Sequence, residues 1–437
     1  MKVVKPLAEQ SYILTLPLLT EKWQEDVLFK RLEIARNIYN ASLGELMKRH
    51  KRLKQDEMYR YWIQQPKSKE RNQALRELNK EYGLSEYAIH TYVKPIQHHF
   101  KKNMDSFTAQ KIATRSWLTF ERYFYGTAKK VVFKRRGELH SVEGKSNTSG
   151  IRFKDRTLYW NGLEISVTVR ERDNYAHMSL KDKVKYCRII HKVVRGKERY
   201  FVQLVLGGVP PEKIDRETGE VKHPRGIGKV GIDIGTQTIA VVTTTEAKLL
   251  ELTPAVNTME REKRILQRKS DRQRRANNPH KYNEDGTIKR TKDRWIASKN
   301  YLKTKSLLSE INRKIADIRK QEHNKMVNWI LSLGDDIKVE TMNYKGLQRR
   351  AKETTVNERT GRINRKKRYG KSLMKKAPSM LLTILDNKLK YADHQLKKIE
   401  TSKVKASQFN HFSGDCVKKT LNERWNDFNG MKVQRDL

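Results

Sequence analysis

The 437-residue chain carries 94 Lys and Arg against 50 Asp and Glu, which gives a formal net charge of +44 at pH 7. Such a charge opposes compaction unless a polyanion neutralises it, so it favours a long nucleic acid as the partner and disfavours a membrane surface. The two cysteines lie far apart and no run of about 18 apolar residues occurs, which excludes a disulfide framework and a membrane-spanning helix.

The N-terminal half shows a strand pattern, then a helical pattern, then several strands. Residues 1–20 contain one strand, at 11–18, which we expect to join a later sheet. Apolar residues then recur at helical spacing, so 21–115 is predicted to be an inserted helical block. Residues 116–226 consist of short β-rich segments, including a hairpin that turns at Arg195-Gly196-Lys197, and predict a small barrel or sandwich. The polar run 212–228 after Pro210-Pro211 is predicted to be a linker.

The C-terminal half, 229–437, opens with a predicted β-hairpin at 230–242. The basic segment 257–277 and the heptad-patterned segment 291–333 predict an antiparallel helical pair joined by a turn at 278–290. A strand is expected at 336–340, and apolar spacing from Leu382 to Ile399 predicts another amphipathic helix. The segment 359–376 is rich in Lys and Arg and has no acid, so we expect it to stay disordered until it meets a polyanion.

Three acids stand out by their context. Asp233 lies inside the apolar hairpin, Glu340 ends the apolar strand, and Asp436 lies next to the last residue. A buried carboxylate is costly without a partner or a metal, and Gly235 leaves room for close approach to the backbone. Structural interpretations compete: Asp233 as a turn cap, Glu340 as a surface charge, and Asp436 as part of a chain end.

Acids at these positions suit one kind of site. An RNase H-like fold places one acid on its first strand, one at the end of a later strand and one at the start of a late helix. Such acids converge on two divalent ions about 3.5–4 Å apart, which activate water and stabilise the leaving oxygen of a phosphodiester. Hard carboxylate oxygens favour Mg²⁺ or Mn²⁺. The sequence therefore predicts a catalytic metal site at Asp233, Glu340 and Asp436.

Three segments resemble the RuvC motifs of TnpB proteins, the transposon-encoded relatives of type V CRISPR effectors: GIDIG at 231–235, IKVETMNYKGL at 337–347 and VQRDL at 433–437. The resemblance covers nearly the whole chain. It implies α/β, α and β lobes: an RNase H-like (RuvC) nuclease domain with a helical insertion at 257–333, an OB-like β-barrel wedge domain and an inserted helical recognition lobe.

The resemblance also implies an RNA-guided DNA endonuclease of the bacterial or archaeal cytosol, associated with the nucleoid. Its partners would be a guide RNA transcribed from the transposon end and double-stranded DNA that carries a short target-adjacent motif. Asp233, Glu340 and Asp436 would be the metal ligands, matched motif by motif.

The chain departs from the family pattern in two places. Many relatives carry a four-cysteine zinc ribbon between the second and third motifs, whereas the target-binding insert at about 401–430 holds only His411 and Cys416. We therefore expect no zinc. In the family a helix follows the third acid, but here only Leu437 follows Asp436. Because chain ends fray, the alternative is an RNA-guided DNA-binding protein with weak or no cleavage, acting as a repressor.

Basic and aromatic clusters are further candidates for nucleic-acid contact. Arg272, Arg274 and Arg275 are predicted to line the heteroduplex, with a solvated basic face as the alternative. The run Arg365-Lys366-Lys367-Arg368 is predicted to contact phosphate. The aromatic cluster at 117–125 fits barrel core better than base stacking.

Two further functions share parts of this pattern. Asp233-Ile234-Gly235-Thr236 also matches the first phosphate loop of actin-like and sugar kinases, but no second Gly-rich phosphate loop follows. A transposase that joins strands could use the same two-metal carboxylate site. The guide, the target-adjacent motif and the oligomeric state are not encoded in any pattern of the sequence.

Overall fold

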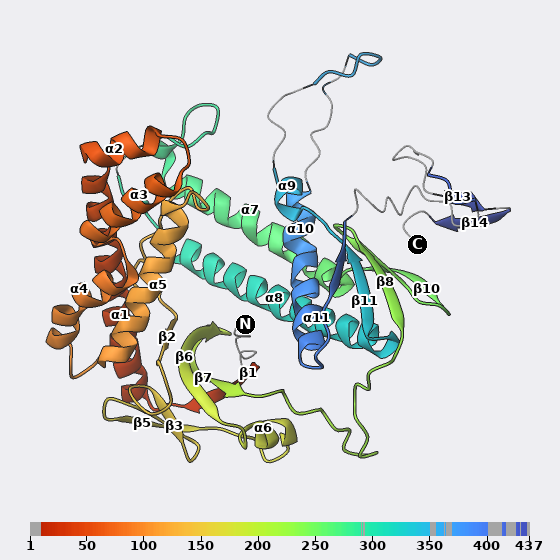
Figure 1. Ribbon diagram of the computed structural model, residues 1–437, viewed down its shortest axis with the longest axis horizontal. Helices are drawn as coiled ribbons and strands as arrows, with labels where there is room; N and C mark the ends of the chain where they lie inside the picture. The colour runs from red at the N-terminus through yellow and green to blue at the C-terminus, as the bar shows by residue number, and fades with distance from the viewer. Residues whose placement is uncertain are drawn as a thin grey trace. The chain divides into compact units, whose positions relative to one another are not determined.

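The computed structural model divides the chain into two compact units, Met1–Pro211 and Glu212–Leu437 (Figure 1). It describes residues 10–289, 291, 293–349, 355–361, 363, 369–400, 413–416, 425–428 and 430–434. The boundary falls at the predicted linker, directly after Pro210-Pro211. Among the described helices, none combines the length and the apolar composition that a bilayer span requires.

The first unit contains a curled, seven-stranded antiparallel sheet in the order β2-β6-β7-β1-β5-β4-β3 (Figure 1). As predicted, the first strand joins this later sheet, between β7 and β5. The turn between β6 and β7 uses Arg195 and Gly196 at positive φ, 52° and 75°, which glycine tolerates at no steric cost. The strands are β1 (Ser11–Leu19), β2 (Ser141–Glu143), β3 (Arg152–Lys154), β4 (Thr157–Trp160), β5 (Leu163–Val167), β6 (Val184–Val194) and β7 (Lys197–Gly207).

The helical block follows β1 as expected. Its helices are α1 (Lys22–Leu53), α2 (Glu57–Gln64), α3 (Lys69–Glu81), α4 (Glu86–His99) and α5 (Ser106–Phe124); a short α6 (Asn174–Ser179) follows β5. Side-chain oxygens at Asp56, Ser68, Ser85 and Asp105 accept backbone N–H bonds at the starts of α2 to α5. These caps satisfy donors that have no partner within the helix and fix where each helix begins.

The predicted change to strands at residue 116 was wrong, because α5 continues to Phe124. The aromatic residues at its end pack within the helical block and not in the sheet. Phe120 is fully buried, and its ring centroid lies 5.6 Å from that of His50 on α1. Tertiary packing against α1 therefore overrides the β-propensity of these aromatic residues.

The second unit contains a five-stranded mixed sheet in the order β10-β9-β8-β11-β12. Strands β8, β9 and β10 pair antiparallel, whereas β11 pairs in parallel with both β8 and β12. The strands are β8 (Lys229–Ile234), β9 (Thr238–Val242), β10 (Ala247–Glu251), β11 (Asp336–Glu340) and β12 (Lys397–Ile399); β13 (Trp425–Phe428) and β14 (Met431–Gln434) form a separate antiparallel pair.

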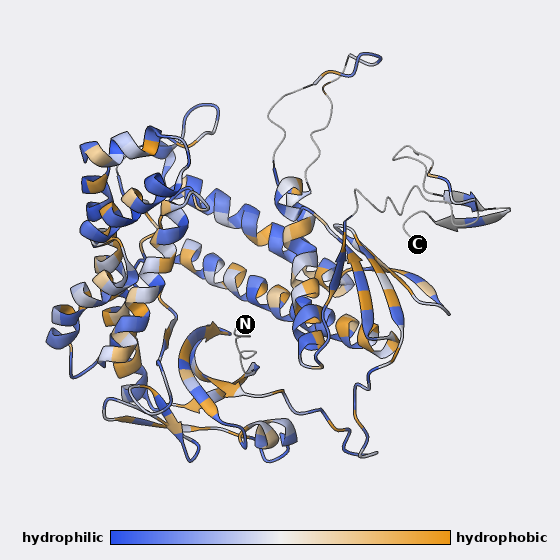
Figure 2. Ribbon diagram, viewed as in Figure 1, coloured by the Kyte–Doolittle hydropathy of each residue, from blue (hydrophilic) through white to orange (hydrophobic). Residues whose placement is uncertain are grey.

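Helices α8 (Lys299–Leu333) and α11 (Pro378–Lys390) cover one face of this sheet. Hydrophobic residues alternate with hydrophilic ones along β8 and β11 (Figure 2). The buried members pack with those of the two helices in one core: Val230, Ile232, Ile234, Val327, Ile330, Leu331, Ile337, Val339, Leu381, Leu385 and Leu389. One face of the sheet is therefore core, and the outward residues of β8 and β11 lie on the other.

The helical elements of this unit are η1 (Pro254–Met259), α7 (Glu260–Asn277), η2 (Pro279–Lys281), α8 (Lys299–Leu333), α9 (Tyr344–Leu347), α10 (Gly370–Lys376) and α11 (Pro378–Lys390). The predicted pairing of α7 with α8 is confirmed, with Ile311 and Ile315 of α8 packed beside Leu266 of α7. The predicted helix from Leu382 to Ile399 was wrong in its second half. Asp393 adopts a positive φ of 56°, and residues 397–399 pair with β11 as a strand.

Candidate metal-binding carboxylate site

Asp233 lies near the end of β8, on the face of the strand opposite the core. Its neighbours Ile232 and Ile234 are buried, whereas Asp233 itself is half-buried. The hairpin holds it in register, because Asp233 pairs with Ala240 and the Gly235 N–H donates to the Thr238 carbonyl at 2.9 Å. The prediction of a hairpin is confirmed, but Asp233 is less buried than an apolar strand suggests.

Glu340 lies at the end of β11, in the same position relative to the core. Along the parallel pair, Val339 is in register with Ile232, and both side chains are buried. The next residue along each strand is Glu340 on β11 and Asp233 on β8. Because in-register residues of neighbouring strands project to the same face, with strands about 4.8 Å apart, continuation of this register puts Asp233 and Glu340 on the same face of neighbouring strands.

Hydrogen bonds fix the segment after Glu340 at two points, Thr341 and Asn343. Thr341 donates to the Ile399 carbonyl through its N–H at 3.0 Å and through Oγ1 at 2.9 Å, which fixes the end of β11 against β12. The Asn343 side chain accepts from the Gly346 N–H at 2.8 Å and caps α9. A Cβ on Gly346 would lie 3.1 Å from Asn343 Cγ, so a larger residue would crowd this cap.

This cap positions Tyr344 beside the carboxylates. The Tyr344 hydroxyl is buried and has no hydrogen-bond partner among the described residues. Burial, and secondly the negative charge of Asp233, raise the pKa of Tyr344 to about 12. Burial also raises the pKa of Glu340. A cation between the acids would offset this by favouring the ionised carboxylates.

A cavity of about 600 Å³ adjoins Glu340 between the ends of β11 and β12 and helix α11. Helix α11 contributes the hydroxyl groups of Ser379 and Thr383 to its wall, and Lys390, which pairs with Asp386 at 2.6 Å. The cavity is large enough for a polar ligand to reach Glu340.

The donor set suits a hard divalent cation but comprises only two carboxylates. Among the described residues, no group of three or more His, Cys, Asp or Glu is placed to hold a metal ion. The third predicted ligand, Asp436, lies outside the described residues, as does His411 of the insert for which no zinc is expected. The structure therefore puts Asp233 and Glu340 on one face of neighbouring strands, and a complete metal site needs at least one further ligand.

Two of the predicted nucleic-acid-binding arginines have contacts within the protein. Arg274 and Arg275 both bond to Asp271, at 2.8 and 3.0 Å. Arg274 also lies 5.4 Å from the ring centroid of Trp295, and Arg275 lies 4.8 Å from that of Tyr282. These contacts hold the loop after α7 against that helix.

The other basic residues differ in their placement. Arg272 is exposed, so it keeps the predicted option of contacting a polyanion. The run Arg365, Lys366, Lys367 and Arg368 lies outside the described residues.

Tyr344 and Asn343 were not assigned roles from the sequence. Both lie within the segment 337–347 that carries the motif resemblance, so the motif itself was the available signal. The sequence pattern did not indicate that Asn343 caps α9, or that Tyr344 lies near Asp233.

No protein-family model matches the chain, and neither does any curated protein. Solved structures that resemble it include a Cas12f1–sgRNA–target DNA complex, at TM-score 0.48 and 9% identity over 95% of this chain and 93% of that one. A CRISPR–Cas12f ternary complex matches at TM-score 0.27 and 14% identity over 95% and 80% of the two chains. The mini-RNA-guided endonuclease CRISPR-Cas_phi3 matches at TM-score 0.38 and 10% identity over 98% and 91%. At these values the likenesses do not assign the chain to a family.

Proposed function

We propose that the chain is an RNA-guided DNA endonuclease of the TnpB type, with Asp233, Glu340 and Asp436 as ligands of Mg²⁺ or Mn²⁺. The observation that supports this proposal is the register of β8 and β11: Val339 pairs with Ile232, so the residues that follow, Glu340 and Asp233, project to the same outward face. Two half-buried acids in adjacent positions repel each other unless a cation or a proton lies between them.

The topology of the second unit supports an RNase H-like (RuvC) domain. In such a domain three antiparallel strands are followed by strands parallel to the first, and acids occupy the first strand and the end of the fourth. The order β10-β9-β8-β11-β12, with β11 parallel to β8, fits this arrangement. The curled antiparallel sheet and the helical block of the first unit would be the wedge barrel and the recognition lobe.

The residues at the site have separate parts in the proposed reaction. Divalent ions bound by the carboxylates would supply an activated water and stabilise the leaving oxygen of the phosphodiester. The buried Tyr344 hydroxyl, which has no hydrogen-bond partner among the described residues, would donate to a water or phosphate oxygen bound at the site. The net charge of +44 suits binding of a guide RNA and a DNA duplex together.

The test is cleavage of a plasmid library by the purified protein with its co-purified RNA in Mg²⁺. Asp233→Ala should abolish cutting while RNA binding stays intact. Asp336→Ala is the matched control, because Asp336 lies on the same face of β11 and pairs with Lys397 at 2.8 Å. Full cutting by the Asp233 variant would refute the metal site.

The same experiment addresses the alternative functions. A native protein that binds its target through the RNA but leaves it uncut would be a guided DNA-binding protein. A strand-transfer assay on transposon ends would reveal a transposase through joined products.

A further inference from the structure

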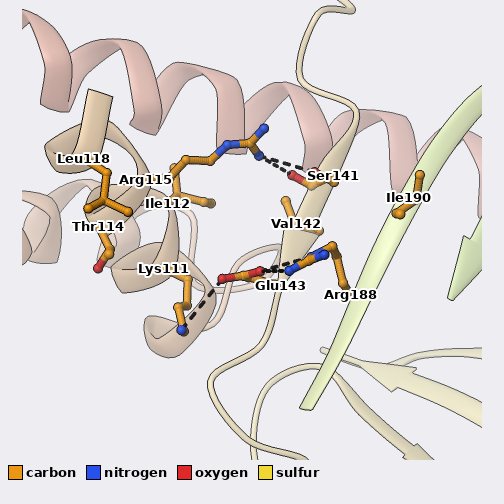
Figure 3. Close-up of a pocket in the computed structure, with 10 residues that line it drawn as sticks. All are labelled: Lys111, Ile112, Thr114, Arg115, Leu118, Ser141, Val142, Glu143, Arg188 and Ile190. Atoms are coloured by element: carbon orange, nitrogen blue, oxygen red, sulfur yellow. Dashed lines mark hydrogen bonds and ion pairs between the residues drawn. The ribbon is translucent and has the colours of Figure 1, made fainter. Parts of the chain in front are cut away.

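A second cavity lies in the first unit, whereas Asp233 and Glu340 belong to the second. It has a volume of about 390 Å³ and lies between helix α5 and strands β2 and β6 (Figure 3). Its accessible apolar lining comes from Leu118 of α5 and Ile190 of β6, whereas Ile112 and Val142, which also border it, are buried in the core. Leu118 and Ile190 give the cavity an apolar surface on which a flat ring can pack.

The carboxylate of Glu143 also lines the cavity, and one of its two oxygens is already hydrogen-bonded to Arg188. Glu143 Oε2 accepts from Arg188 Nε and Nη2 at 3.0 and 2.8 Å. Its other oxygen, Oε1, is 3.7 Å from Lys111 Nζ, which is an ion pair but too long for a hydrogen bond. Within the described residues Glu143 Oε1 therefore has an acceptor position open to a ligand N–H.

A guanidinium with unused donors also lines the cavity. Arg115 Nη1 donates to the carbonyl and the hydroxyl of Ser141, at 3.1 and 3.3 Å. The Arg115 side chain is exposed, and its Nε and Nη2 groups make no hydrogen bond to the described part of the chain. Figure 3 shows Arg115 and the Glu143–Arg188 pair on separate parts of the lining. Three cations and one carboxylate leave the cavity with a positive balance, which suits an anion.

We propose that this cavity binds one unpaired nucleotide, with its base against the apolar surface, its exocyclic amino group on Glu143 and its phosphate on Arg115. A carboxylate acceptor selects a base that presents an amino donor, and it matches cytosine N4. Uracil presents a carbonyl at the same place, which would face the carboxylate with no proton between them. The cavity therefore prefers a cytidine over a uridine nucleotide. Nucleotide binding in this cavity does not involve Asp233 or Glu340, so the proposal does not depend on whether the chain cuts DNA.

The test uses the full-length protein and two free nucleotides, CMP and UMP. Binding is measured by calorimetry at about 0.5 M salt, where non-specific phosphate contacts are screened. CMP should bind about 10-fold more tightly than UMP, the ratio expected for one hydrogen bond to a charged group. Equal affinity for the two nucleotides in the native protein would overturn the proposal, and that comparison needs no variant.

Two variants and one control assign the roles. Arg115→Ala should weaken CMP binding about 10-fold, through loss of the contact to phosphate. Arg122→Ala, the control, removes the same charge from an exposed position two turns along α5 and should leave CMP binding unchanged. Glu143→Gln should remove the preference for CMP, since an amide can donate to uracil as well as accept from cytosine. Equal losses in the Arg115 and Arg122 variants would contradict the proposal.

The source of the nucleotide is distinguished by a second pair of ligands. RNA hairpins with a single bulged cytidine or a bulged uridine present the same chemistry within a strand. A preference for the cytidine bulge that disappears in the Glu143→Gln variant identifies an unpaired residue of a nucleic acid as the occupant. A preference confined to free CMP identifies a mononucleotide site, and equal affinity for CMP and UMP refutes the proposal whatever the two hairpins show.

Discussion

The two sheets of this protein each bury one face, and they differ in how exposed the acids and other residues of the outward face are. In the antiparallel sheet of the first unit, β1 alternates between exposed and buried at each of its nine residues. In the mixed sheet of the second unit, β8 and β11 send their apolar side chains to a core shared with α8 and α11. Their outward positions include Asp233 and Glu340, both half-buried.

The difference shows where each sheet can accommodate costly groups. An exposed polar residue on β1 is solvated and costs little. A half-buried carboxylate on β11 loses part of its hydration, which raises the pKa of Glu340. In the mixed sheet, neighbouring residues of β11 therefore have different roles: Val339 packs in the core and stabilises the fold, whereas Glu340, on the opposite face, is the proposed metal ligand.

The largest expected effect comes from the outward face of β11. Glu340→Gln keeps the size of the side chain but removes its charge, so cleavage should fall about 10²–10³-fold. The free energy of unfolding should stay the same or rise slightly, because burial disfavours the ionised carboxylate. Plasmid cleavage and urea unfolding measure the two quantities. Thr15→Ala on the outward face of β1 is the control and should change cleavage by less than about twofold.

The inward faces should respond in the opposite way. Val339→Ala on β11 and Val202→Ala on β7 each remove fully buried methyl groups. Each should cost about 2 kcal/mol, from about 0.8 kcal/mol per buried CH₂ plus a small cavity. Hydrogen exchange should show lost protection in β8 and β11 for the first variant, and in β1 and β7 for the second. Unchanged protection in β8 after Val339→Ala would contradict the assigned core.

A smaller effect is expected at the cap that follows β11. Asn343→Ala removes the acceptor for the Gly346 N–H and should destabilise α9 by about 1 kcal/mol. Because α9 holds Tyr344 beside Asp233, cleavage should also fall, by about 10-fold. Ser298→Ala removes the N-cap of α8 and is the matched control, with a similar loss of stability and unchanged cleavage. Equal cleavage losses in the two variants would point to stability as the only cause.

Much of the second sheet was predictable from sequence because its strands carry strong local patterns. The hairpin of β8 and β9 and the strand 336–340 were found from apolar runs bounded by turn residues. The helix after Leu382 was predicted too long, since the apolar spacing continues through Leu396, just before the three-residue strand β12, and Ile399, at its end. A strand this short has no alternation of its own, and only its pairing with β11 defines it.

Local sequence patterns also predicted part of the candidate site. Asp233 and Glu340 attract attention as acids in apolar surroundings, but their adjacency depends on the parallel register of β8 and β11, which no local pattern encodes. The cavity beside α5 was not predicted at all. Its residues come from three elements, and Arg115, Glu143 and Arg188 form no motif along the chain.

The last prediction concerns the helix that covers the mixed sheet. Lys388 of α11 donates to Asn328 Oδ1 of α8, and burial, followed by the charges of Lys213 and Arg225, lowers its pKa to about 8 from 10.5. Between pH 8 and 10.5, Lys388 is protonated in the unfolded chain but largely deprotonated in the folded chain. The contribution of Lys388 to the free energy of unfolding therefore rises with pH across this range. Lys388→Met should therefore be more stable than the native protein at pH 7, by no more than about 1 kcal/mol for a partly solvated group. This difference should shrink as the pH rises from 8 to 10, which urea unfolding at several pH values measures. A difference that is independent of pH would show that packing, and not the charge of Lys388, limits the stability of this side of the sheet.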